Sequence, residues 1–118
     1  MKEIFFYSYP KCSTCRKASK WLDQNNISYQ FIDIVKNPPS KKFLELALKQ
    51  FSLDIKKIFN TRGKSYKSIE VDILDLTKKR IIELLSNNGK LIKRPFLIIN
   101  ESKLLLGFNE SEYIANLK

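Results

Sequence analysis

The two cysteines of the chain lie three positions apart, as Cys12 and Cys15 in a Cys-x-x-Cys motif. The apolar run 4–7 before the motif predicts a short buried strand, and apolar residues at three- and four-residue spacing after it predict a half-buried helix. A thiol at the start of a helix faces free backbone N–H groups and the positive end of the helix dipole, which favour the thiolate. The motif therefore predicts a nucleophilic thiol with a second thiol close by.

We assign Cys12 as the attacking thiolate, because it is nearer the predicted helix start, and Cys15 as the resolving thiol. Ser13 and Thr14 are candidates to donate hydrogen bonds to the thiolate, with helix capping as the alternative role for both. Arg16 adds positive charge beside them. Two buried, unreactive cysteines are the alternative interpretation of the motif, since free cysteine is often buried.

The chain contains no histidine, which excludes a Ser-His-Asp triad, a Cys-His nucleophile pair and a zinc site with histidine ligands. Two cysteines supply half of a four-cysteine zinc site, so zinc binding would require dimerisation through the motif. We expect a monomer with no metal and no resident cofactor.

The net charge is +10 over 118 residues, with lysines scattered through every segment. Lysines flanked by apolar residues in a helical rhythm are typical of solvated helix faces, so we expect no direct binding to nucleic acid. The charge favours anionic partners such as phosphate-like oxyanions, glutathione or an acidic protein surface. No run approaches the roughly 20 apolar residues of a membrane span, and we expect a cytoplasmic protein without membrane contact.

After the first helix, the alternating stretch 28–34 predicts a second strand, which completes a strand-helix-strand unit with parallel strands. Residues from about 40 to 88 are predicted to be mainly helical, with Ser40 and Thr77 as helix N-caps. Gly89 is predicted to close the last of these helices as a glycine C-cap.

The C-terminal part of the chain predicts a buried strand at 96–99, a hairpin partner at 104–106 and a final helix that begins with Asn109 as its N-cap. This element order predicts an α/β protein with a thioredoxin-like fold and a helical insertion after the second strand. We expect a single domain over residues 1–118, with the insertion at about 40–88.

Several short motifs, taken in their order and spacing, resemble the ArsC/Spx family, which comprises arsenate-reductase-like proteins and redox regulators of the Spx and MgsR type. The resemblance covers essentially the whole chain and is carried by the segments 12–17, 38–40, 59–63, 91–95 and 107–110. It implies a thioredoxin-like fold with a helical insertion. It also implies a cis peptide bond before Pro95, beside the nucleophilic cysteine.

Arsenate reductases of this family have three arginines that bind the oxyanion, and the resemblance places Arg94 at one of these positions. Asn60 and Gly107 occupy the other two, with Arg62 two residues after the first of them. Because an arsenate dianion needs several guanidinium groups, we expect a thiol-disulfide redox protein rather than a true arsenate reductase. The resemblance implies that Arg94 faces the thiolate, with a surface position at the sheet edge as the alternative. Arg62 is a weaker candidate to bind an anion, with a solvated loop charge as its alternative. A thiol or disulfide would be the substrate, and glutathione or a thioredoxin system would supply the electrons.

The alternative function is that of an Spx-like redox-sensing transcription regulator. Such regulators carry Cys-x-x-Cys as a redox switch and bind the C-terminal domain of the RNA polymerase α subunit. The pairs Thr61-Arg62 and Arg94-Pro95, and the segment 107–110, are similar to theirs. A non-catalytic interaction domain is a third interpretation.

Overall fold

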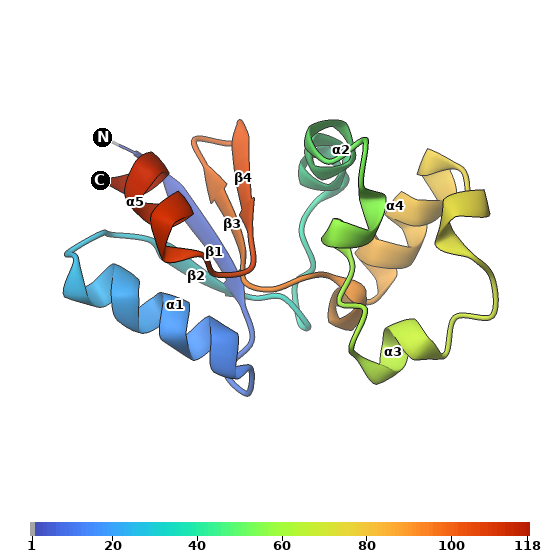
Figure 1. Ribbon diagram of the computed structural model, residues 1–118, viewed down its shortest axis with the longest axis horizontal. Coiled ribbons are helices and arrows are strands. Elements are labelled where there is room, and N and C mark those ends of the chain that lie inside the picture. The colour runs from blue at the N-terminus through green and yellow to red at the C-terminus, as the bar shows by residue number, and fades with distance from the viewer. Residues whose placement is uncertain (1) are drawn as a thin grey trace. The chain divides into compact units, whose positions relative to one another are not determined.

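The computed structural model describes residues 2–118, and its chain forms two compact units (Figure 1). The first unit comprises Met1–Asp33 and Arg94–Lys118, and the second comprises Ile34–Lys93. The helical insertion predicted at about 40–88 lies inside the second unit. The organisation of the chain as a single domain stays a prediction.

A four-stranded sheet in the order β2-β1-β3-β4 forms the centre of the first unit. Strand β1 pairs in parallel with β2, whereas β3 pairs antiparallel with both β1 and β4. The predicted α/β class, the parallel strand-helix-strand unit and the C-terminal hairpin are all confirmed. The strands are β1 (Ile4–Ser8), β2 (Gln30–Asp33), β3 (Phe96–Ile99) and β4 (Lys103–Leu106).

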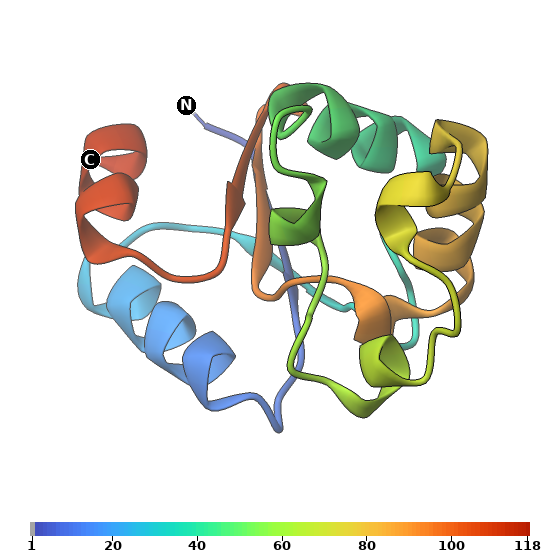
Figure 2. The same cartoon turned by 45° about the vertical axis from the view of Figure 1, so that its right-hand side comes forward.

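Helices α1 (Ser13–Gln24) and α5 (Glu110–Leu117) pack on the same face of this sheet (Figures 1 and 2). Alternate residues of a strand point to one face, so every second strand residue joins the apolar side chains of the two helices. The indole Nε1 of Trp21 donates a 2.9 Å hydrogen bond to Glu110 Oε2, which joins the two helices directly. The resulting core consists of Ile4, Phe6, Ala18, Trp21, Leu22, Leu97, Ile99, Leu105, Tyr113 and Leu117.

The second unit is mainly helical, and its two longest helices, α2 and α4, pack against each other. Each of them buries a single apolar stripe, as the periodicity of the sequence predicts. The elements of this unit are α2 (Lys41–Gln50), η1 (Ile55–Ile58), α3 (Lys64–Lys67), η2 (Ile73–Asp75), α4 (Lys78–Asn87) and η3 (Gly89–Leu91), where η denotes a short 3₁₀ helix.

Of the three N-caps predicted from the sequence at Ser40, Thr77 and Asn109, two make a capping hydrogen bond through the side chain. Thr77 Oγ1 accepts a hydrogen bond from the backbone N–H of Arg80 at 3.2 Å, and Asn109 Oδ1 accepts one from Glu112 at 3.0 Å. Ser40 is the N-cap residue of α2, but its hydroxyl makes no capping hydrogen bond.

The predicted glycine C-cap at Gly89 is wrong. Helix α4 ends at Asn87, Asn88 caps it in an extended conformation, and Gly89 begins η3 without a positive φ. The physical reason for glycine here is close approach of two backbone segments: a Cβ at Gly89 would lie 1.9 Å from the carbonyl oxygen of Ile34. No side chain fits at that position.

Among residues 2–118, the structure contains no helix with the length and hydropathy needed to cross a membrane.

Substitution of Gly89 by alanine should destabilise the second unit, because its Cβ can be accommodated only if the backbone around Ile34 moves. We expect a loss of roughly 2 kcal/mol or more in the free energy of unfolding. Urea denaturation followed by far-UV circular dichroism measures this loss.

The matched control is Gly63→Ala, whose Cβ would meet a movable side-chain nitrogen of Asn60 at 2.7 Å. This change should cost about 1 kcal/mol or less. Equal stabilities of the two variants would contradict the role assigned to Gly89.

Candidate thiol redox site

Cys12 is the N-cap residue of α1, directly after the turn that follows β1. Its backbone N–H donates to the carbonyl oxygen of Tyr9 at 2.9 Å, which closes that turn. Its Sγ accepts a hydrogen bond from the backbone N–H of Cys15 at 3.4 Å. The sulfur thus occupies the place that a serine or aspartate oxygen usually fills at a helix start, where the helix dipole favours negative charge.

The two thiols are free, and they differ sharply in exposure. Cys12 is partly exposed, whereas Cys15 is 1% exposed and faces the interior of the first unit. The pKa of the Cys15 thiol is raised to about 11. Burial is the main cause, the hydrogen bond with Cys12 and the negative charge of the Cys12 thiolate add to it, and hydrogen bonds from Ser8 and Tyr9 act in the opposite direction. Cys15 is therefore protonated at neutral pH.

The pKa of Cys12 is lowered. Partial burial raises it, but this effect is outweighed by hydrogen bonds from the side chain and the backbone of Cys15, a hydrogen bond from Arg94, and the positive charge of Arg94. The pKa shifts of the two thiols are therefore opposite, and the thiolate form is the nucleophilic one. The assignment of Cys12 as nucleophile and Cys15 as resolving thiol stays a prediction.

Strand pairing explains why Arg94, far along the chain, reaches the motif. In the antiparallel β1–β3 pair, Tyr7 lies opposite Phe96, so the residues that follow β1 run alongside those that precede β3. The Arg94 guanidinium carbon accordingly lies 5.0 Å from the centre of the Tyr9 ring. The Arg94-Pro95 peptide bond is cis, as the family resemblance implies.

One guanidinium nitrogen of Arg94, Nη1, is buried without a hydrogen-bond partner among the described residues. A buried donor without a partner is costly, and a cationic donor is satisfied best by an anionic acceptor. Because this nitrogen is out of contact with solvent, an anionic atom of a substrate would reach it only after neighbouring side chains move.

The other candidate residues have different surroundings. Ser13 is exposed and Thr14 half-buried, and within residues 2–118 neither hydroxyl forms a hydrogen bond with the Cys12 sulfur. Arg16 is exposed, and its Nη1 donates to the carbonyl oxygen of Pro10 at 3.0 Å, so it braces the turn. Arg62 is exposed in the second unit, and its role as an anion ligand stays a prediction.

Two further residues of the site, Ser8 and Tyr9, were not among those predicted from the sequence. Ser8 is 4% exposed at the end of β1 and forms a hydrogen bond with Cys15, and Tyr9 stacks with Arg94. Both residues lie between the predicted strand and the Cys-x-x-Cys motif. Because the chain turns there, residues at this junction lie beside the cysteines, and their position could have predicted them as site residues.

A shallow groove of about 470 Å³ runs beside the motif within the first unit. Cys15 and Ser8 contribute to it from the motif side, and Phe31 of β2 contributes an exposed aromatic ring. In the part of the chain that the structure describes, no cluster of three or more metal-ligating side chains is present.

Taken together, the parallel strand-helix-strand unit, the antiparallel C-terminal hairpin and the Cys-x-x-Cys at the start of α1 define a protein with a thioredoxin-like fold and a thiol site. Pro95, preceded by its cis bond, is buried at the start of β3.

The chain belongs to the ArsC family, whose family model matches residues 7–116. It is 40% identical to the uncharacterised protein YusI of Bacillus subtilis, over 96% of this chain and 97% of YusI. It is 33% identical to the global transcriptional regulator Spx of Listeria innocua, over 92% of this chain and 82% of Spx. A solved structure described as a possible arsenate reductase from Streptococcus mutans is 38% identical and superimposes with a TM-score of 0.87, over 98% of this chain and 99% of that one.

Substitution of Arg94 by methionine should raise the pKa of Cys12 toward that of an unperturbed cysteine, because it removes a hydrogen bond and a positive charge from the thiolate. The rate of alkylation by iodoacetamide, measured against pH with mass spectrometry to separate the two cysteines, reports this change. In the unsubstituted protein, Cys12 should react at lower pH than a free cysteine, and Cys15 should become reactive only as the pH approaches 11.

Arg16→Met is the matched control, since its guanidinium is bound to Pro10 instead of Cys12. Its alkylation profile should stay close to that of the unsubstituted protein. An Arg94→Met profile that coincides with it would show that Arg94 does not tune the thiolate.

Proposed function

We propose that this protein is a thiol-disulfide oxidoreductase in which Cys12 attacks and Cys15 resolves. The observation that carries the proposal is the asymmetry of the two hydrogen-bonded thiols: Cys12 has a lowered pKa at the helix start, and Cys15 is a buried thiol with a raised pKa. The membership of the ArsC family, with its arsenate-reductase-like solved structures, supports the same reading.

The reaction begins when the Cys12 thiolate attacks one sulfur of a substrate disulfide. A new disulfide forms between Cys12 and that sulfur, and the other substrate sulfur leaves as a thiolate, which takes a proton from solvent. Cys15 then loses its proton and attacks the Cys12 sulfur, which releases the second substrate thiolate and leaves a Cys12–Cys15 disulfide. Two thiols of an external reductant return this disulfide to the dithiol, so the electrons balance.

Arg94 acts in the first step. Its hydrogen bond and charge hold Cys12 as the thiolate, and its unpartnered Nη1 is available to an anionic group of the bound substrate once neighbouring side chains move. Glutathione carries two carboxylates and a thiol, so a glutathione mixed disulfide is a fitting substrate, and glutathione or a thioredoxin system is a fitting reductant.

Arsenate is a poorer fit as the substrate. Of the two arginines in the first unit, Arg94 contacts the nucleophile and Arg16 is bound to a backbone oxygen of the turn. A single guanidinium group leaves most of the charge of an arsenate dianion unmatched.

A cytoplasmic location and a monomeric state complete the proposal. The proposed cycle ends with reduction of the Cys12–Cys15 disulfide by external thiols, and the cytoplasm supplies such reduced thiols.

Trapping distinguishes the roles of the two cysteines. When the Cys15→Ser variant is mixed with oxidised glutathione, we expect a stable mixed disulfide on Cys12, detected as one added glutathione by mass spectrometry. The unsubstituted protein should instead form an internal disulfide, and Cys12→Ser should form neither product and lose essentially all reductase turnover. A mixed disulfide that forms on Cys15 in the Cys12→Ser variant at an equal rate would refute the assignment.

The similarity to Spx favours a second function, that of a redox-controlled transcription regulator. In that case the Cys12–Cys15 pair is a switch without turnover, and the partner is the C-terminal domain of the RNA polymerase α subunit.

A pull-down with that domain, in the presence of either diamide or dithiothreitol, tests the regulator. The regulator requires binding that changes with the redox state and that becomes redox-independent in Cys12→Ser. Absence of binding in both states eliminates the regulator and leaves the oxidoreductase unaffected.

A further inference from the structure

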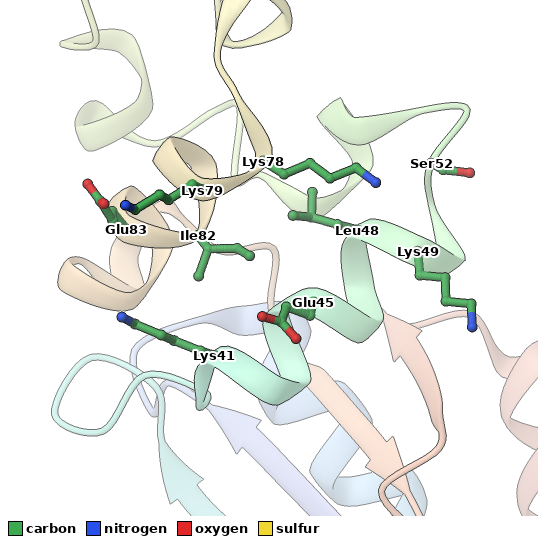
Figure 3. A pocket seen from close by; sticks show the side chains of 9 residues that line it. All are labelled: Lys41, Glu45, Leu48, Lys49, Ser52, Lys78, Lys79, Ile82 and Glu83. Atoms are coloured by element: carbon green, nitrogen blue, oxygen red, sulfur yellow. The ribbon is translucent and has the colours of Figure 1, made fainter.

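The second unit has a groove between α2 and α4, with a volume of about 860 Å³ (Figure 3). Leu48 of α2 and Ile82 of α4 form its apolar part, and lysine side chains extend around them from both helices (Figure 3). The whole groove belongs to one unit of the fold, and it contains neither cysteine. Nothing in the redox chemistry requires it.

The charges that line this groove do not balance. Its four lysines are free of ion pairs among the described residues, whereas Glu83 is paired with Arg80 at 3.1 Å. Glu45 is thus the remaining carboxylate that offsets the lysines within the groove. These lysines are Lys41, Lys49, Lys78 and Lys79.

Three of these lysines, Lys41, Lys78 and Lys79, lie at helix starts and cost helix stability, whereas Lys49 lies in the last turn of α2, where the dipole favours it. Helix α2 begins with Lys41-Lys42 and α4 begins with Lys78-Lys79-Arg80, and neither helix has an acidic residue in its first turn. A cation at the positive end of the helix dipole is unfavourable. A local arrangement that opposes stability is expected where a surface serves binding, because an anionic partner offsets the repulsion.

We propose that this groove binds an acidic amphipathic helix of a partner protein. Helix α2 has ten residues and so measures about 15 Å, which matches two to three turns of a bound helix. Apolar residues of the partner at i, i+3 or i+4 would cover the half-buried Ile82, with the buried Leu48 beneath the groove floor, and carboxylates on both sides of that stripe would pair with the lysines. The hydrocarbon stems of the lysines extend the apolar contact.

Other occupants fit less well. A nucleic-acid backbone would leave the apolar floor uncovered and would meet the carboxylate of Glu45. A second copy of this chain would bring a further net charge of +10 to a surface that is already positive.

The test uses the full chain and a fluorescently labelled synthetic peptide helix with leucines on one face and glutamates on the other. Its control is a peptide of the same composition with a scrambled order, which has no apolar face. We expect saturable binding in an anisotropy titration, at least about tenfold tighter than for the scrambled peptide, and weaker at high salt.

Two groove variants locate the site. Lys79→Glu reverses one of the exposed groove charges and should weaken peptide binding by about tenfold or more, and Ile82→Asp should do the same through the apolar floor. The matched control is Lys103→Glu, an exposed lysine of β4 in the first unit, which should leave the affinity within about twofold. Circular dichroism of each variant confirms that it is folded, and Lys79→Glu remains informative if Ile82→Asp unfolds.

The proposal is overturned by any of three results: equal binding of the scrambled peptide, equal loss of affinity in Lys103→Glu and Lys79→Glu, or no saturable binding. Tighter binding of a single-stranded oligonucleotide or of vesicles with anionic lipid than of the peptide would also overturn it. Dimerisation of the chain that is abolished by Lys79→Glu would assign the groove to a second copy and reject the partner helix.

Discussion

The contact on which the site depends is the hydrogen bond from the backbone N–H of Cys15 to the Cys12 sulfur. It exists because β1 ends at Ser8 and a tight turn places Cys12 at the exact position where α1 begins. A shift of that helix start by one residue would move the sulfur away from the N–H group and the dipole. The packing of α1 on the sheet, with the Trp21–Glu110 hydrogen bond, keeps the helix start in place.

Two chemically identical side chains acquire different chemistry from their places on this helix. Successive helix residues are rotated by about 100°, so the residue three positions after the cap turns toward the sheet. Cys15 is therefore buried beside Ser8, and its pKa rises, while Cys12 keeps solvent access and is stabilised as the thiolate. The opposite pKa shifts of the two thiols, on which the proposed roles rest, follow from geometry and need no base such as histidine.

Local signals in the sequence were sufficient to predict helix starts and the pairing of neighbouring strands in both units. Thr77 and Asn109 have the side chains of helix caps and act as such, and the strand-helix-strand order fixed the parallel pairing of β1 and β2. Residue type alone did not predict the role of a residue whose environment is formed by segments far away in the sequence. Gly89 is explained by the carbonyl of Ile34, and Arg94 reaches the thiolate through the β1–β3 register, which only the family resemblance anticipated.

The role of the lysines also depends on segments that are distant in the sequence. Taken along the chain, the lysine clusters have the pattern of solvated helix faces, and for an isolated helix that reading is sufficient. In the second unit, however, lysines of α2 and α4 gather around Leu48 and Ile82, and those at the two helix starts oppose the helix dipoles. If these lysines only kept the helix surfaces solvated, positions near the helix C-termini would do so equally well, and there the dipole would favour them. Their placement is best explained by an anionic partner, which separates a recognition surface in one unit from the thiol chemistry in the other.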